Sequence, residues 1–216
     1  MKPRLALYSD QEIPANAVVN RRLLTLIGAE CPRIGYVSSA PDPARHYFSH
    51  KQAYYHALGC DLSVYVDSDV VAQTGLLAML LDCDAIHLTG GNTYFFLRWL
   101  LESGLIQSLR SYATDGGILI GASAGSLLMT RSIAIAELSG DTPDPSMTSL
   151  EALGLVDFHF WPHYRPGAEN QPGESAFLSK VELTYACPDG AGVIIDGPRV
   201  ELIGEVKAFH YGQIDA

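Results

Sequence analysis

Short apolar runs alternate with longer segments of helical periodicity in the part of this 216-residue chain that precedes residue 135. Strands that alternate with helices form βα units, which predict a mainly parallel sheet covered on both faces. The predicted strands span residues 5–8, 34–37, 62–66, 85–89 and 117–122. The predicted helices span residues 17–27, 43–58, 70–80, 93–103 and 106–114, and another is expected after Ser123. The expected fold is therefore a three-layer α/β/α sandwich.

The pattern changes beyond residue 135. Residues 139–147 are dense in turn formers and predict a surface loop. A strand at 158–162, a helix at 173–183 and short antiparallel strands at 192–196, 199–203 and 206–210 are expected to follow. No linker, repeat or low-complexity segment divides the sequence, so residues 1–216 are predicted to form a single α/β domain.

Composition and charge narrow the expected partners and compartment. Hydrophobic residues make up 48% of the chain and charged residues 18%, which is typical of a globular protein. The formal net charge of −10 disfavours nucleic acid, and no apolar run is long enough for a membrane span or a secretory signal. The four cysteines are widely spaced and include no C-x-x-C pair, as in reduced cytoplasmic proteins. We therefore expect a cytoplasmic protein without a metal or other cofactor, and with no nucleic acid or membrane partner.

Residues 116–129, GGILIGASAGSLLM, form the most informative segment. An apolar strand leads into G-A-S-A-G at 121–125, and a helical pattern follows. A G-x-S-x-G sequence in this context forces a sharp turn at the serine, and its glycines let the backbones of strand and helix approach closely. The hydroxyl of Ser123 is then exposed at the carboxyl end of the sheet, where α/β proteins bind ligands. The segment predicts a nucleophilic serine; the simpler alternative is an inert serine in a tight turn.

A second glycine loop, HLTGGNT at residues 87–93, ends another predicted strand and begins another helix. Asn92 is placed either to cap this helix or to contact a substrate. If the two loops are neighbours, the amides of Gly91 and Ala124 face one substrate oxygen and form an oxyanion hole. A Gly-Gly helix start is also common in turns without any catalytic role.

Among the seven histidines, His163 is the best candidate for a general base. It ends an apolar strand and begins a polar loop, which predicts a position at the same sheet edge as Ser123. His46 and His50 share a helix face but have no carboxylate partner of the kind that zinc sites use. His87 falls inside a predicted buried strand and is expected in the core.

The acid that would orient His163 has two candidates. Asp189 lies in a turn before the strand at 192–196, and Asp141 lies in the loop between Ser123 and His163. Because loop carboxylates are usually only solvated, the residues alone leave this choice open.

Five short motifs follow one another along the chain: Gly90-Gly91-Asn92-Thr93, Gly121-Ala122-Ser123-Ala124-Gly125, Leu153-Gly154-Leu155, Pro162-His163-Tyr164 and Pro188-Asp189-Gly190. In this order, and with the short closing strands, they resemble the peptidase E and cyanophycinase family. That family consists of serine hydrolases with the class I glutamine amidotransferase-like fold. The matching order and spacing cover nearly the whole chain, so the combination is far more specific than any one motif.

The resemblance implies that Ser123 is the nucleophile and His163 the general base. It also implies that Asp189 occupies the position of the triad carboxylate, which is often the longer Glu. Asp141 matches a segment with a functionally important aspartate, so it is expected to contact the α-amino group of the substrate and is the reserve candidate for the triad acid. The implied activity is hydrolysis of short peptides by a dipeptidase or an aminopeptidase-like enzyme through an acyl-enzyme, and any self-association is expected to give a homodimer.

One departure from the family pattern concerns specificity. Aspartyl dipeptidases of the family resemble one another in a Gly-Glu-Thr-Arg-like stretch after the histidine, and its arginine is suited to a substrate carboxylate. The matching residues here are GESA at 173–176, so Ala176 replaces the arginine. We therefore expect a preference other than strict Asp-X, with Arg165 as the reserve candidate for the missing charge.

Three other functions share part of this pattern, and the residues disfavour the first two. An α/β-hydrolase esterase shares the G-x-S-x-G motif, but the chain lacks an HGGG-type segment and has its histidine soon after the serine. A glutamine amidotransferase would need cysteine at position 123. A catalytically silent binding module could retain the same fold, and a fluorophosphonate label on Ser123 would separate it from an enzyme.

Overall fold

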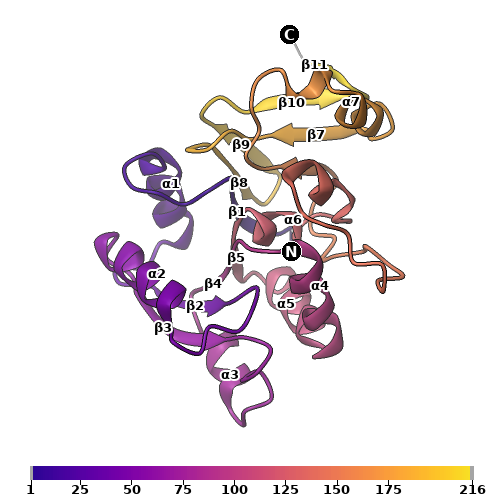
Figure 1. Cartoon of the computed structure of the whole chain (residues 1–216). Helices are drawn as coiled ribbons and strands as arrows, with labels where there is room; N and C mark the ends of the chain where they lie inside the picture. The colour runs from indigo at the N-terminus through magenta and orange to yellow at the C-terminus, as the bar shows by residue number, and fades with distance from the viewer. Residues whose placement is uncertain (1, 215–216) are drawn as a thin grey trace.

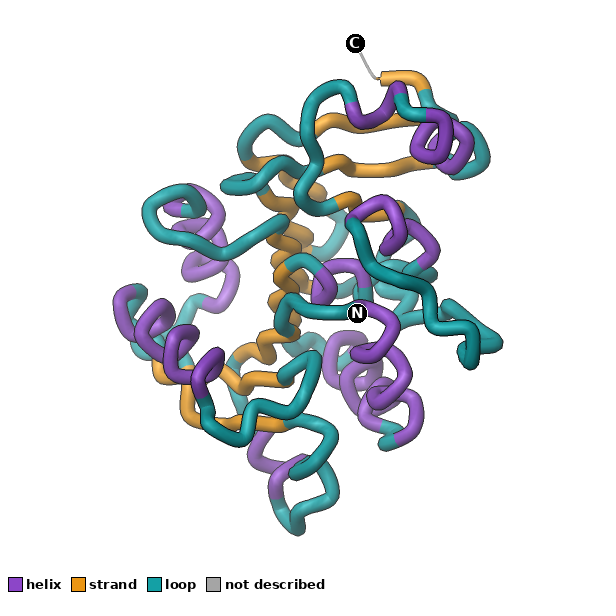
Figure 2. The backbone as a smooth tube through the Cα atoms, in the orientation of Figure 1, coloured by secondary structure: helices purple, strands orange, loops and turns teal. Residues whose placement is uncertain are grey.

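The computed structural model describes residues 2–214, and its central feature is a seven-stranded sheet with helices on both faces (Figure 1 and Figure 2). The strands are β1 (Arg4–Tyr8), β2 (Arg33–Val37), β3 (Asp61–Val66), β4 (Ala85–Leu88), β5 (Ile118–Ala122), β8 (Gly192–Asp196) and β9 (Arg199–Ile203). Their order across the sheet is β3-β2-β4-β5-β1-β8-β9. The first five strands are mutually parallel, and β8 and β9 pair antiparallel at one edge.

The helices follow the strands in the order expected of βα units. They are α1 (Ala17–Ile27), α2 (His46–Ala57), α3 (Leu76–Leu81), α4 (Thr93–Glu102), α5 (Leu105–Thr114), α6 (Ala124–Leu127) and α7 (Pro172–Leu178), with 3-10 turns at Ala134–Ser139 and Ala168–Asn170. The predicted three-layer α/β/α sandwich is confirmed.

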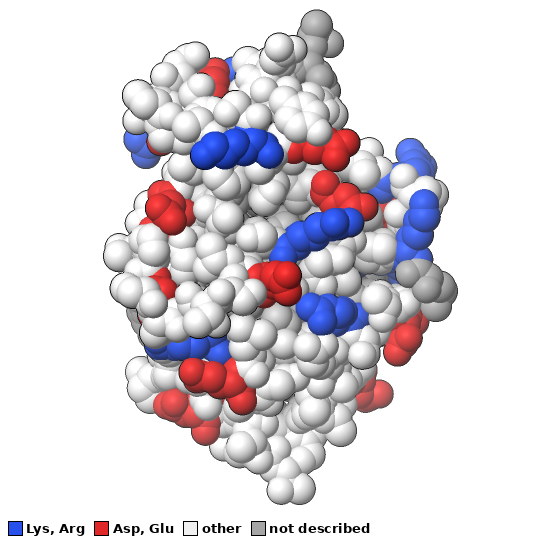
Figure 3. Space-filling model, turned by 90° about the vertical axis from the view of Figure 1, so that its right-hand side faces the viewer, with Lys and Arg blue, Asp and Glu red and all other residues white. Residues whose placement is uncertain are grey.

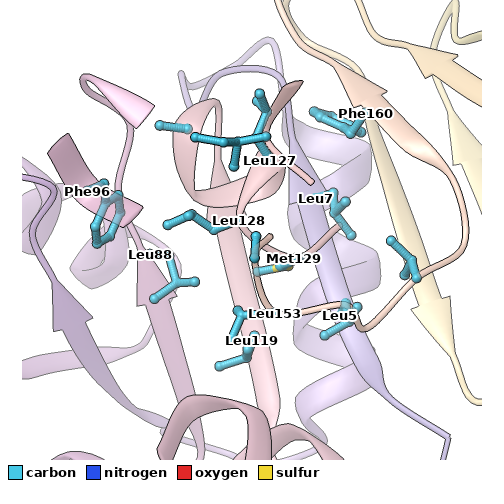
Figure 4. Packing of buried hydrophobic residues seen from close by; sticks show 14 of the residues in the cluster. Leu5, Leu7, Leu88, Phe96, Leu119, Leu127, Leu128, Met129, Leu153 and Phe160 are labelled. Atoms are coloured by element: carbon cyan, nitrogen blue, oxygen red, sulfur yellow. The ribbon is translucent and has the colours of Figure 1, made fainter. Parts of the chain in front are cut away.

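Successive side chains of the central strands enter opposite layers. In β1, Leu5 and Leu7 pack into the cluster that includes α4, α5 and α6, whereas Ala6 and Tyr8 pack with α1 and α2. Figure 4 shows Leu5 and Leu7 on the side of the sheet where Met129 lies. Both faces of the strand are therefore buried, which explains why it reads as an uninterrupted apolar run in the sequence.

Helix α3 is shorter than the sequence predicts, because it begins at Leu76 instead of residue 70. The carboxylate of Asp67 accepts hydrogen bonds from the amides of Asp69 and Val70, at 2.9 and 3.1 Å, and so stabilises a turn there. Gly75 then adopts a left-handed φ of 83° directly before the helix. Side-chain bonds to the backbone thus replace the expected first turns of the helix.

The end of the chain differs most from expectation. A second, four-stranded sheet has the order β11-β10-β7-β6, from β6 (His159–Trp161), β7 (Leu183–Ala186), β10 (Lys207–His210) and β11 (Gln213–Ile214). The strands predicted at 192–196 and 199–203 do extend the main sheet as β8 and β9. The expectation that 206–210 continues this meander was wrong, because β10 pairs with β7 instead. The expected helix at 173–183 ends at Leu178, and β7 begins where that helix was predicted to end.

No helix within residues 2–214 is both long and apolar enough to cross a membrane. Figure 3 shows acidic and basic side chains interspersed over one face of the molecule, with broad uncharged areas between them. On that face the charge is therefore distributed and does not form a single extended basic surface.

Candidate active site

Ser123 lies in the sharp turn between β5 and α6, as the G-x-S-x-G motif predicts. Its φ of 49° and ψ of −110° lie outside the regions that residues with a Cβ normally adopt, at a cost of about 1–3 kcal/mol. Main-chain hydrogen bonds hold this conformation. The amide of Ser123 donates to the carbonyl of Tyr8 at 3.0 Å, and its carbonyl accepts from the amides of Ser126 and Leu127.

The two glycines of the motif are required by close backbone contacts. A Cβ at Gly121 would lie 2.5 Å from the amide nitrogen of Ser126, and one at Gly125 would lie 2.1 Å from the carbonyl oxygen of Leu88. The amide of Gly125 also donates to the carbonyl of Thr89 at 2.9 Å. Gly121 therefore lets the turn close on helix α6, and Gly125 lets that helix approach the neighbouring strand β4.

His163 and Asp189 extend a series of hydrogen bonds from Ser123. Nε2 of His163 lies 2.9 Å from Oγ of Ser123, and its Nδ1 lies 2.6 Å from Oδ1 of Asp189. The side chains of His163 and Asp189 are 43% and 61% exposed, so both are accessible to a substrate. Of the two acids that the sequence leaves open, Asp189 is the one in contact with the histidine.

Ser9 belongs to the same cluster, although the sequence reasoning does not single it out. It is fully buried directly after β1, and its Oγ lies 2.7 Å from the amide nitrogen of His163 and 3.0 Å from Oδ1 of Asp189. The available signal was its position: a polar residue at the carboxyl end of a predicted parallel strand shares the sheet edge with Ser123.

The second glycine loop lies beside the first, because β4 and β5 are neighbouring strands. A Cβ at Gly90 would lie 3.6 Å from Cβ of Ser123. Gly91 has a φ of 131°, and a Cβ there would lie 2.1 Å from Oγ of Ser39, so this position requires glycine. The amide of Ala124 begins α6 and therefore has no acceptor one turn earlier in that helix.

Asn92 and Asp141 both cap the beginning of α4. Oδ1 of Asn92 accepts from the amide of Phe95 at 2.8 Å, and Oδ2 of Asp141 accepts from the amide of Thr93 at 2.9 Å. These bonds satisfy amides that a helix leaves unpaired at its first turn. Asp141 is thus next to the second glycine loop and, within residues 2–214, forms no hydrogen bond with His163.

The two positions that bear on substrate charge are both exposed. Arg165 lies in the loop after His163 and forms no ion pair with any residue of the described chain. Ala176 lies on α7. The only cation that the sequence reasoning proposed for this site is therefore at the surface and unpaired in the structure.

A cavity of about 680 Å³ opens beside Ala122, the residue before Ser123. One wall is the second glycine loop at 90–92, and another is formed by His46, His50 and Lys51 of α2. The sequence gives no indication that this end of α2 borders the site, because the contact depends on the position of β2 next to β4.

Burial lowers the pKa values of two basic groups of the cavity wall. Desolvation lowers the pKa of Lys51 to about 8, and its Nζ donates to Oε1 of Gln11 at 3.1 Å. Burial, together with the charge of Lys51, lowers the pKa of His87 well below its usual value, so His87 is neutral. The expected core position of His87 is confirmed, and its Nδ1 lies 3.1 Å from the hydroxyl of Tyr55.

The model of peptidase family S51 matches residues 5–203, a range that includes Ser123, His163 and Asp189. The chain belongs to peptidase family S51. Membership of this family makes it a hydrolase of the peptidase class, as the resemblance in the sequence implied.

Several curated relatives of this S51 peptidase are known. It is 29% identical to the uncharacterized peptidase YgaJ of Bacillus subtilis (strain 168), over 83% of this chain and 76% of YgaJ. It is 40% identical to a Drosophila melanogaster protein named probable alpha-aspartyl dipeptidase, over 60% of this chain and 57% of the relative. It is 32% identical to peptidase E of Streptomyces coelicolor, over 61% and 57% of the two chains. The match thus spans less than two thirds of the last two relatives.

Two solved structures share the fold of this S51 peptidase. A Listeria monocytogenes EGD-e protein named after peptidase E superposes with a TM-score of 0.73 at 22% identity, over 93% of this chain and 97% of its own. A peptidase from an acI-B1 Actinobacterium gives a TM-score of 0.72 at 17% identity, over 98% and 91% of the two chains. These similarities confirm the fold class expected from the sequence.

Proposed function

We propose that this S51 peptidase is a serine peptidase that hydrolyses short peptides through Ser123, His163 and Asp189. The observation that carries the proposal is the series of contacts from Oγ of Ser123 to Nε2 of His163, at 2.9 Å, and from Nδ1 to Asp189, at 2.6 Å. A carboxylate that holds the Nδ1–H of an imidazole leaves the Nε2 lone pair to accept the serine proton, as a general base must.

The first half of the reaction forms an acyl-enzyme. Nε2 of His163 takes the hydroxyl proton of Ser123 while Oγ attacks the scissile carbonyl, and Asp189 stabilises the imidazolium that results. The carbonyl oxygen becomes an oxyanion that accepts hydrogen bonds from the amides of Gly91 and Ala124. His163 then donates its proton to the leaving amine as the C–N bond breaks. In the second half, water takes the place of the amine and attacks the ester that joins the acyl group to Ser123. The same proton transfers then run in reverse order and release the acid.

The strand order supports an assignment of the two sides of the substrate. His163 is held on the β1 side of Ser123, so the leaving amine that it protonates belongs on that side. The glycine loop and the cavity follow β4, on the opposite side of β5. We therefore place the N-terminal, acyl-forming residue of the peptide in the cavity. Asp141, which borders the glycine loop through Thr93, is our candidate for the contact with the α-amino group.

Specificity for an N-terminal Asp would require a cation near its carboxylate, because an unpaired buried charge is costly. Ala176 cannot supply one, so we propose a preference wider than strict Asp-X. Our candidates for a cation that meets an acidic side chain are Arg165, in the loop after His163, and Lys51, in the cavity wall.

We also propose that the enzyme acts in the cytoplasm. The four cysteines Cys31, Cys60, Cys83 and Cys187 are all unpaired. Reduced thiols of this kind are the rule in compartments where disulfides do not persist.

The proposed activity is tested by digestion of a dipeptide and tripeptide library, read by mass spectrometry, together with fluorophosphonate labelling. We expect cleavage of short peptides and a label on Ser123 that is absent from Ser123→Ala. Hydrolysis of p-nitrophenyl esters of long acids without peptide cleavage would instead indicate an esterase. Absence of both label and cleavage in the folded protein would indicate a silent binding module.

A further inference from the structure

The carboxyl end of β1 contacts all three residues of the proposed triad. The carbonyl of Tyr8 accepts a hydrogen bond from the amide of Ser123 at 3.0 Å. The next residue, Ser9, has its Oγ 2.7 Å from the amide nitrogen of His163 and 3.0 Å from Oδ1 of Asp189. Ser9 is fully buried, whereas the side chains of His163 and Asp189 are exposed. One buried hydroxyl therefore anchors two exposed residues.

The chemistry of the groups sets the direction of both hydrogen bonds. A backbone amide only donates, so Oγ of Ser9 accepts from the N–H of His163. An ionised carboxylate only accepts, so the hydroxyl proton of Ser9 goes to Oδ1 of Asp189. The same carboxylate oxygen lies 2.6 Å from Nδ1 of His163. Ser9 thus joins the backbone of the histidine to the side chain of the acid.

Both partners need such support. His163 has a φ of 55°, in the left-handed region that is unfavourable for a residue with a Cβ. Asp189 lies in an exposed turn, a kind of segment that is usually mobile. Asp10, the residue after Ser9, also supports that turn, because its Oδ1 accepts a hydrogen bond from the amide of Gly190 at 2.7 Å.

We propose that Ser9 is a positioning residue for catalysis, an inference that rests on the function proposed above. It acts through His163 and Asp189: its two hydrogen bonds keep Nδ1 of the histidine on the carboxylate, and so keep Nε2 at Oγ of Ser123. Reaction rate depends steeply on such geometry, whereas ground-state binding of a peptide does not require it.

The first test is Ser9→Ala. We expect kcat to fall about 10–100-fold while KM changes less than about twofold, because an interaction used mainly in the transition state is lost. The rate of fluorophosphonate labelling of Ser123 should fall by a similar factor. The matched control is Ser103→Ala, which removes another hydroxyl that bonds to the main chain, at the end of α4, and should leave kcat unchanged.

A double-mutant cycle separates positioning from general structural damage. In the Asp189→Ala background, Ser9 keeps the hydrogen bond from the amide of His163 but has no carboxylate to hold. The loss in kcat caused by Ser9→Ala should therefore be smaller there than in the wild-type background. An equal loss in both backgrounds would overturn the proposal, as would a folded Ser9→Ala enzyme with kcat within threefold of wild type.

Ser9→Cys covers the case in which the alanine variant does not fold, because the thiol fills the site with a somewhat larger group that is only a weak donor and acceptor. It should show the same loss of kcat, and unfolding of both variants would overturn positioning in favour of a structural role. The outcomes for Ser123→Ala keep the two proposals distinct. If that variant is active, the proposed function fails; if it is inactive while Ser9→Ala has wild-type kcat, only the inference about Ser9 fails.

Discussion

Nε2 of His163 lies 2.9 Å from Oγ of Ser123, although Ser123 follows β5 of the main sheet and His163 follows β6 of the second sheet. When two groups act in one proton transfer, removal of either abolishes the same step, so removal of both costs little more. We expect Ser123→Ala to abolish peptide hydrolysis and the double variant with His163→Ala to lose little more. Steady-state kinetics of the two single variants and the double variant checks this. Near wild-type turnover in Ser123→Ala would refute the mechanism.

The two acidic residues should have different effects. We expect Asp189→Asn to lower kcat, by about 10³–10⁴-fold if the pair behaves as in other triads, because the imidazolium loses its support. Asp141→Ala should reduce kcat/KM more for peptides with a free α-amino group than for N-blocked ones. Parallel assays on a free and an acetylated peptide test both. An indifferent Asp189 together with an Asp141 that is essential on blocked peptides would reverse the assignment.

Substrate preference should differ from strict Asp-X because Ala176 supplies no cation. We expect kcat/KM for Asp-Leu to exceed that for Ala-Leu or Met-Leu by less than about 100-fold, which corresponds to roughly 2.7 kcal/mol. Comparison of wild type with Arg165→Ala and Lys51→Met locates any acidic preference that exists. A preference of 100-fold or more that collapses in Arg165→Ala would establish that arginine as the substitute and rule out our first choice.

Two glycines should respond oppositely to alanine. At Gly125 a Cβ would lie 2.1 Å from the carbonyl oxygen of Leu88, so Gly125→Ala should destabilise the fold by roughly 3 kcal/mol or more. At Gly173, on α7, a Cβ meets no atom within 4 Å, and Gly173→Ala should stabilise by about 0.5–1 kcal/mol. Thermal unfolding of the two variants measures both effects. Equal Tm values would contradict the backbone contact assigned to Gly125.

Lys51 should make stability depend on pH in a defined window. Its pKa is about 8 in the folded protein and about 10.5 in an unfolded chain, so between these values the unfolded state binds more protons. The contribution of Lys51 to the free energy of unfolding should therefore rise as pH increases through that window. At pH 7 its buried charge should cost on the order of 1–3 kcal/mol, with allowance for partial exposure.

Denaturant unfolding of wild type and Lys51→Met between pH 7 and 10.5 measures this contribution by difference. We expect the variant to be more stable at pH 7 and the difference to shrink as pH rises. A difference that stays constant over this range would show that Lys51 does not titrate with the lowered pKa.

Local features of this protein were predictable from its sequence. The central strands are buried on both faces, so their apolar runs predicted β1, β2, β4 and β5 within about one or two residues. The sharp turn at Ser123 was equally predictable, since the steric need for glycine at Gly121 and Gly125 is imposed by residues close to the turn and by the strand beside it. A helix was expected after Ser123, and α6 is there.

The contacts between distant segments were decided only by the tertiary structure. Asp189 and Asp141 are both loop carboxylates, and local sequence does not distinguish an acid that meets His163 from one that caps α4. The contacts of Ser9 and the pairing of β10 in a second sheet depend likewise on which strands become neighbours. A strand pattern specifies which face is buried, whereas its hydrogen-bonding partner is chosen by the packing of the whole chain.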